Sequence, residues 1–199
     1  MVLVCCAPYP EESFDWVGLL PALVTFLIGI GGYVLAYMQI SKPLKAAKNE
    51  RELRSVSKKL NEFYAPFYQL RKKSYALYVE FRKNCLKEDS EFTSTLKYLL
   101  EGKSFTGNTA VLLDEIIRIG EECESFIHRN AGLIDDESIR NDLLPRLTTH
   151  YRLLRLATEG KLSGDIDTIG KYTFPSKIDE HLENRIKELE SDIARLSKG

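Results

Sequence analysis

The chain has 199 residues, of which 44% are hydrophobic and 29% charged, with a formal net charge of -1 and a mean hydropathy of -0.23. These averages exclude collagen-like, low-complexity and strongly disordered chains, as well as a protein whose whole surface is basic and attracts nucleic acid. Four cysteines without a CxxC pair are too few for a disulfide framework. The averages nevertheless combine segments of very different charge and hydropathy.

The first element predicted along the chain is a transmembrane helix over residues 16–41, preceded by a short segment, residues 1–15, of net charge -3. No charged side chain occurs between Trp16 and Ile40. At a rise of about 1.5 Å per residue, this run is long enough to cross a hydrocarbon core about 30 Å thick. A cleaved signal peptide is not favoured, because no Lys or Arg precedes the run and the run exceeds the usual ~7–15 apolar residues. We therefore expect the helix to remain as an anchor.

Basic residues follow the predicted span directly and set its orientation. Residues 42–83 contain twelve basic residues against four acidic ones. The positive-inside rule predicts a single-pass protein of the inner (plasma) membrane, with the N-terminus outside and the C-terminal domain in the cytoplasm. Membrane lipid is the expected partner of the basic residues, through anionic headgroups, and RNA or another nucleic acid is the alternative partner. The candidate contact residues are Lys42, Lys45, Lys48, Arg51, Arg54, Lys58 and Lys59.

Small residues recur within the predicted span at alternating spacings of three and four. In lipid, such a stripe lets two helix backbones approach closely, and a 3.5-residue repeat favours a left-handed crossing. We expect a homo-oligomer, which is either a compact tether of two or three helices or a ring around an uncharged pore. Gly31 lies off the stripe. The small-residue stripe consists of Gly18, Ala22, Thr25, Gly29, Gly32 and Ala36.

An all-α cytoplasmic bundle is predicted for residues 42–160, because apolar residues recur there at helical spacing and no segment alternates with period two. Its first element is a long basic and aromatic helix over residues 42–84. Proline is expected to end or bend the chain at Pro43 and to kink this helix at Pro66.

Capping residues and glycines divide the rest of this domain into three shorter helices, which complete an antiparallel bundle. Pro145 is expected to interrupt the last of them. The predicted helices run from Ser90 to Leu100, from Thr106 or Asn108 to Gly132, and from Asp135 or Asp136 to Gly160.

A linker over residues 161–175 and a C-terminal amphipathic helix over residues 176–199 complete the chain. Ser176 and Asp179 form the pattern of a capping box at the start of this helix. Ile at a and Leu at d positions is typical of parallel two-stranded coiled coils, but fewer than three heptads need support from the bundle or from an oligomer. The predicted coiled-coil residues are Leu182, Ile186, Leu189, Ile193 and Leu196.

No cofactor or metal site is predicted, because the three histidines fall on different expected helices without a metal-binding spacing. The acidic cluster at residues 135–137 is interpreted as helix capping. The candidate catalytic residues are Arg146 and His150, which resemble the Arg and His of HEPN ribonucleases. In that family four to six residues separate the pair, whereas here only three do. The resemblance implies a degenerate HEPN-like RNA-binding or RNase effector as one alternative function.

The layout of the chain, one span followed by an all-helical cytoplasmic domain, resembles the small membrane effectors and accessory proteins of bacterial anti-phage systems, including CRISPR-associated helical pore proteins. This resemblance implies an oligomeric pore-forming effector or accessory protein in antiviral defence. The main alternative is a membrane-tethered adaptor that recruits a cytoplasmic protein partner through its helical domain and C-terminal helix.

Overall fold

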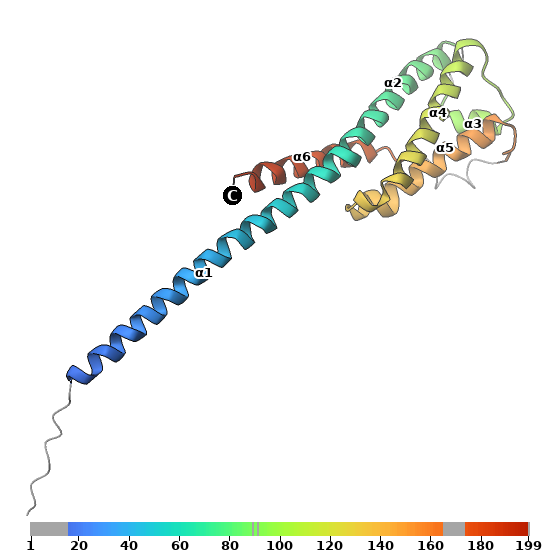
Figure 1. The fold of residues 1–199 in the computed structure, drawn as a ribbon. Helices are drawn as coiled ribbons and strands as arrows, with labels where there is room; N and C mark the ends of the chain where they lie inside the picture. Colours follow the sequence, from blue (N-terminus) through green and yellow to red (C-terminus); the bar gives the residue numbers. More distant parts are fainter. Residues whose placement is uncertain (1–15, 89, 91, 165–173, 199) are drawn as a thin grey trace, which may run out of the picture. The chain divides into compact units, whose positions relative to one another are not determined.

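The computed structural model describes residues 16–88, 90, 92–164 and 174–198 of the chain (Figure 1). Every regular element of these residues is helical and none is a strand, which confirms the all-α prediction. The chain divides into two compact units, Met1–Asn49 and Glu50–Gly199. The predictions for residues 1–15 and for most of the linker lie outside the described residues.

The first described element is the long helix α1, Trp16–Lys59, and the first unit contains its part before Glu50. The helix continues through both Pro21 and Pro43, so Pro43 does not end it, and the alternative expectation of a bend there stays a prediction. Proline removes one hydrogen-bond donor, but its φ near -65° is compatible with a helix. The other backbone hydrogen bonds of this long helix therefore maintain it on both sides of each proline.

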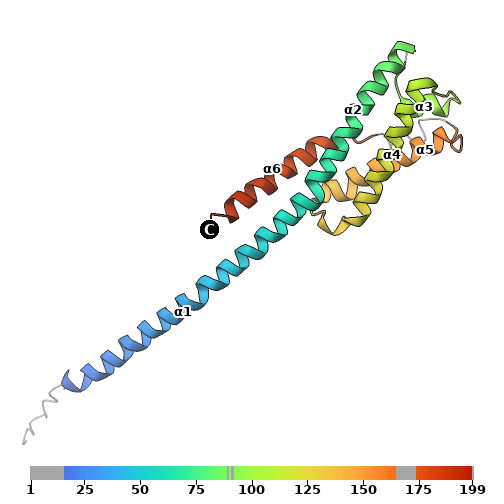
Figure 2. The ribbon, with the colours of Figure 1, turned by 45° about the horizontal axis from the view of Figure 1, so that its top comes forward.

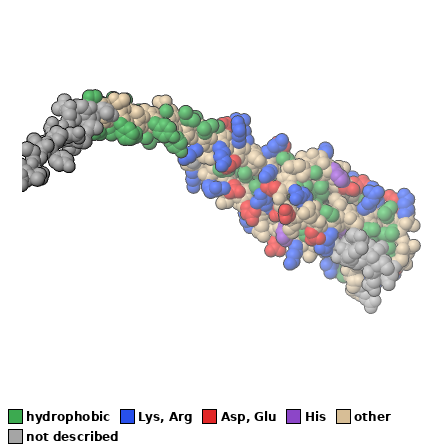
Figure 3. Space-filling view, turned by 90° about the horizontal axis from the view of Figure 1, so that it is seen from below, with side chains coloured by type: hydrophobic (Ala, Val, Ile, Leu, Met, Phe, Trp, Pro, Cys, Tyr) green, Lys and Arg blue, Asp and Glu red, His purple; other side chains and the backbone are tan. Residues whose placement is uncertain are grey.

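Apolar side chains of α1 between Leu20 and Leu44 are exposed in the described structure. The large ones among them are between 42% and 74% exposed. Figure 3 shows hydrophobic side chains along this segment, with Lys and Arg side chains beyond it. This part of α1 is apolar and long enough to cross a membrane, and none of its most apolar window is buried in the structure.

Two π-helical segments precede prolines in the second unit. The segment η1, Leu60–Tyr64, lies just before Pro66, and η3, Ile139–Leu143, lies just before Pro145. In both, the N–H that follows the segment donates to the carbonyl five positions earlier. A proline ring collides with the carbonyl four positions earlier in a regular α-helix, and the wider π turn accommodates it. The irregularities expected at these two prolines thus take the form of π-bulges.

Three helices form the centre of the second unit. Helix α2, Ala65–Glu88, packs against α4, Gly107–Arg129, and α4 packs against α5, Leu144–Thr158 (Figures 1 and 2). The short helix α3, Thr95–Leu100, packs against α5. The core between them is largely aromatic on the side of η1 and α2. The rings of Phe63 and Phe67 stack there with their centroids 5.4 Å apart.

The boundaries of the shorter helices differ from those expected. Helix α3 begins after Ser94, whose side chain accepts the Lys97 N–H, and not at Ser90. Helix α4 begins after Thr106, as expected, but ends before a 3-10 turn, η2, at Ala131–Leu133. The hydrogen bond from the Lys97 N–H to the Ser94 side chain favours a helix start at this serine.

Helix α6, Ile178–Leu196, packs against η1, α2 and η3 (Figures 1 and 2). The side chains of Leu182 and Leu189 are 0% and 1% exposed, so this face of the predicted coiled coil is buried within the chain's own bundle. The predicted capping box is wrong, because Lys177 is the N-cap residue and makes no side-chain cap bond. Asp179 instead binds a side chain of α2.

Candidate functional site

A cavity of about 450 Å³ lies in the second unit, between α2, α4, α5 and the start of α6. Its lining is mostly apolar and aromatic, and α4 supplies Leu113 and Ile116. Polar side chains also line it, from α2, the start of α3, α5 and the start of α6: Arg71, Ser74, Thr93, Ser94, Thr95, His150, Tyr151, Ser176 and Asp179.

Arg71 is the central polar residue of this cavity, and it is only 1% exposed. Its Nε donates to Oδ1 of Asp179 at 3.1 Å and its Nη2 donates to Oδ2 at 3.3 Å. The ring of Phe174 lies against the guanidinium, with its centroid 4.7 Å from Cζ. A two-point contact with a carboxylate is the geometry that best neutralises a buried guanidinium. The pair therefore holds the first turn of α6 against α2.

Tyr151 connects Arg71 to α5. Its hydroxyl accepts a hydrogen bond from Nη1 of Arg71 at 2.6 Å and lies 2.7 Å from Oγ of Ser74. Burial raises the pKa of Tyr151, so its phenol stays protonated near neutral pH. The ring packs on Gly120 of α4 so closely that a Cβ at this glycine would lie 2.4 Å from Cγ of Tyr151. Gly120 therefore fixes the position of the tyrosine.

The two candidate catalytic residues have different surroundings. His150 lines the cavity, and its ring centroid lies 5.6 Å from that of Phe174. Arg146, one turn earlier on α5, forms an ion pair with Asp142 at 3.7 Å and does not line the cavity. A joint catalytic role for the two residues stays a prediction.

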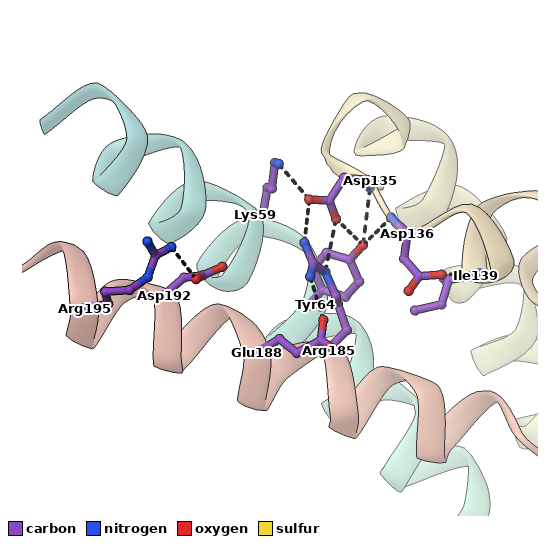
Figure 4. A network of polar contacts seen from close by, with 9 residues as sticks. All are labelled: Lys59, Tyr64, Asp135, Asp136, Ile139, Arg185, Glu188, Asp192 and Arg195. Carbon is purple, nitrogen blue, oxygen red and sulfur yellow. Dashed lines mark hydrogen bonds and ion pairs between the residues drawn. The ribbon is translucent and has the colours of Figure 1, made fainter. Parts of the chain in front are cut away.

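A second polar network joins η1, the segment before η3, and α6 (Figure 4). Its centre is the carboxylate of Asp135, which accepts hydrogen bonds from Nζ of Lys59 at 2.7 Å, Nη2 of Arg185 at 2.8 Å and the hydroxyl of Tyr64 at 2.8 Å. The Tyr64 oxygen also accepts the backbone N–H groups of Asp135 and Asp136, each at 3.3 Å. This network fastens the middle of α6 to the bundle.

Asp136 caps the following helix, because its Oδ1 accepts the N–H of Ile139 at 2.8 Å. This confirms capping for Asp136, whereas Asp135 of the same cluster belongs to the polar network. Among the described residues, no group of His, Cys, Asp or Glu is arranged to hold a metal ion.

Ionisation in this network is strongly shifted. Burial alone would raise the pKa of Asp135, but the hydrogen bonds from Lys59, Arg185 and Tyr64 outweigh it and lower the pKa from 3.8 to about 2. Burial, together with the hydrogen bond to Asp135, raises the pKa of Tyr64 to about 12. The Asp135 carboxylate therefore stabilises the folded state above about pH 4 and loses this contribution as the pH falls through about 2. The protonated Tyr64 phenol stabilises the folded state below about pH 10 and loses this contribution as the pH rises through about 12.

The predicted basic contact residues fall into two groups. Lys42, Lys45, Lys48 and Arg51 have exposed side chains along α1. In contrast, Arg54 pairs with Glu50, Lys58 pairs with Glu62, and Lys59 belongs to the Asp135 network. All three residues of the second group thus have an acidic partner.

The small-residue stripe lies in α1 throughout. The hydroxyl of Thr25 donates to the carbonyl of Pro21 at 2.8 Å, which satisfies it inside the helix. A Cβ at Gly29 or Gly32 would meet nothing within 4 Å, and the same holds for Gly31 off the stripe. The surroundings of Gly18 and Ala22 lie outside the described side chains.

Sequence reasoning missed the Arg71–Asp179–Tyr151 cluster. The one local signal was Ser74, which interrupts an otherwise apolar stripe of residues on α2. A polar residue on the buried face of a helix requires a partner, but the sequence does not identify it.

Comparison of the chain with known proteins finds no matching family model, no matching curated protein and no matching solved structure.

Proposed function

We propose that the protein is a single-pass membrane protein that self-associates through α1. The observation that carries this proposal is the exposure of the apolar part of α1, whose large side chains between Leu20 and Leu44 are 42% to 74% exposed. Burial of each such side chain contributes a free energy of about 1.5–3 kcal/mol. This contribution is lost in water and gained in a hydrocarbon environment. A core helix of a soluble domain would instead be covered by its neighbours.

The polar groups of this segment support a lipid environment. The Thr25 hydroxyl is satisfied within the helix, and no charged residue occurs before Lys42 in α1. Unsatisfied polar groups are costly in hydrocarbon, so this arrangement is the one a span requires. The charge balance on the two sides supports an N-terminus outside the inner membrane and a cytoplasmic helical unit. The exposed Lys42, Lys45, Lys48 and Arg51 would then lie near anionic headgroups.

Self-association rests on the small-residue stripe. The open space around Gly29 and Gly32 leaves room for a second helix backbone. A ring of such helices would enclose a pore without charged groups. The resemblance of the layout to that of anti-phage membrane effectors favours this pore-forming or accessory role. The adaptor alternative recruits a partner through the helical domain and α6. Because Leu182 and Leu189 are buried, recruitment through their face of α6 requires α6 to leave the bundle.

The test compares leucine substitutions on and off the stripe. Gly29→Leu combined with Gly32→Leu is expected to weaken self-association roughly tenfold or more, because the side chains would separate the two backbones. Gly31→Leu is the matched control, since it adds the same bulk in equally open space within the protomer. The measurement is the mass of the full chain in detergent by light scattering, over a range of protein concentrations.

The same measurement distinguishes the roles, since two or three copies indicate a tether and a larger number indicates a ring. An unchanged mass in the double variant, or an equal loss in the control, would disprove association through the stripe.

A further inference from the structure

The Arg71 guanidinium carries donors that the chain does not use. A guanidinium has five N–H groups, and three of them donate to Asp179 and Tyr151. The other two have no acceptor among the described residues, and the side chain is 2% exposed. Buried donors without an acceptor are costly, so an oxygen brought into the adjoining cavity would be favoured there.

Several aromatic residues line the cavity beside these donors. Tyr75 and Tyr78 of α2 line it and are 55% and 37% exposed, so they are reached from solvent. Phe174 covers one face of the guanidinium, and the ring of His150 lies edge-on to Phe174 at an interplanar angle of 78°. The volume of about 450 Å³ is within the range of roughly 300–1,000 Å³ typical of small-molecule sites. A planar apolar group fits such a lining.

The charge of the lining limits the ligand's own charge. Among the described lining residues, Arg71 is the one Lys or Arg, and Asp179 already balances it. A dianionic phosphate would leave two negative charges without a cation and a monoanion only one, and each such charge is costly in a mostly apolar site. A monoanionic carboxylate needs only the two remaining N–H donors.

From these three observations we propose that the cavity beside Arg71 binds a small aromatic monocarboxylate. The ring occupies the aromatic part of the cavity, and the carboxylate accepts from the guanidinium on the side that Asp179 leaves open. The proposal goes beyond membrane anchoring and does not depend on it.

Asp179 opposes binding of a carboxylate at this site. Its carboxylate competes with the ligand carboxylate for one guanidinium, and two like charges at one site repel each other. Asp179→Asn keeps an oxygen that can accept from Nε but removes the competing charge. This variant is therefore expected to bind an aromatic carboxylate more tightly than the native chain does.

The experiment is isothermal titration calorimetry of the full chain in lipid nanodiscs, with empty nanodiscs as the blank. The probes are 1-naphthaleneacetate and its uncharged analogue 1-naphthaleneacetamide. We expect the acid to bind the native chain roughly tenfold more tightly than the amide, and Asp179→Asn to tighten acid binding by roughly another tenfold. Binding of the amide stays unchanged in this variant. Glu183→Gln, on α6 but outside the cavity lining, is the matched control and alters neither affinity.

A second variant keeps the test decisive if Asp179→Asn does not fold. Tyr75 is exposed, so Tyr75→Ala leaves the core intact and is expected to weaken both probes roughly three- to tenfold. Absence of binding by the acid to the native chain overturns the proposal. So does equal binding of acid and amide, or an unchanged affinity of both probes in Tyr75→Ala.

Discussion

Replacing Gly120 by alanine is expected to destabilise the helical unit by about 2–4 kcal/mol. The new Cβ would lie 2.4, 2.5 and 2.8 Å from Cγ, Cδ1 and Cβ of Tyr151, which no relaxed structure tolerates. Overpacking of a core costs about 1–3 kcal/mol, and displacing Tyr151 also weakens its bonds to Arg71 and Ser74, at about 1 kcal/mol each. Alanine's higher helix propensity offsets only about 1 kcal/mol of this loss.

The measurement for Gly120→Ala is amide hydrogen exchange of the full chain in nanodiscs, followed in α4 and α5. The matched control is Gly132→Ala, because a Cβ at Gly132 meets nothing within 4 Å. Protection in the control should stay within about 0.5 kcal/mol of the native value. Equal protection in the two variants would show that α4 and α5 do not pack as described.

Replacing Arg71 by leucine is expected to destabilise the same unit by about 3 kcal/mol. The substitution leaves the Asp179 carboxylate partly buried without its cation and removes the donor to Tyr151. Breaking one side of a buried ion pair costs about 3–5 kcal/mol. The lower end applies because the side chain of Asp179 is 28% exposed and keeps some hydration.

A double-mutant cycle separates the ion pair from general packing. Arg71→Leu combined with Asp179→Leu should recover part of the stability lost in Arg71→Leu, because no unpaired charge then remains. Amide hydrogen exchange in α2 and α6 measures the stability that the double variant recovers. Strictly additive losses would mean that Arg71 and Asp179 are not coupled and that α6 is held by other contacts.

The sequence allowed the local features of the fold to be predicted. Helical spacing predicted the all-α class, and the uncharged run after Trp16 predicted the apolar part of α1. The cap at Asp136 was predictable because capping involves residues only three positions apart. These predictions succeeded because each depends on neighbours along one helix.

The features that failed depend on contacts between distant segments. Asp179 lies 108 positions after Arg71, and its pattern with Ser176 equally suits a capping box, so only the folded chain decides its partner. The apolar stripe of α6 left packing on the bundle and a coiled coil in an oligomer both open, and only the folded chain shows that Leu182 and Leu189 lie in its own core. The tight contact of Gly120 with Tyr151 leaves no signal beyond a glycine in a helix.

The central claim, a span with its N-terminus outside, is tested most directly by thiol labelling of intact bacterial spheroplasts that express the full chain. Cys85 and Cys123 are buried, at 2% and 0% exposed, and burial raises the pKa of the Cys123 thiol to about 11, so both react poorly. Cys5 and Cys6, which precede α1 in the sequence, are then the thiols that report the outside.

A membrane-impermeant maleimide is expected to label the chain in the membrane fraction before lysis, and Cys5→Ser combined with Cys6→Ser should abolish that label. Labelling that occurs only after lysis, or recovery of the chain in the soluble fraction, would contradict the account.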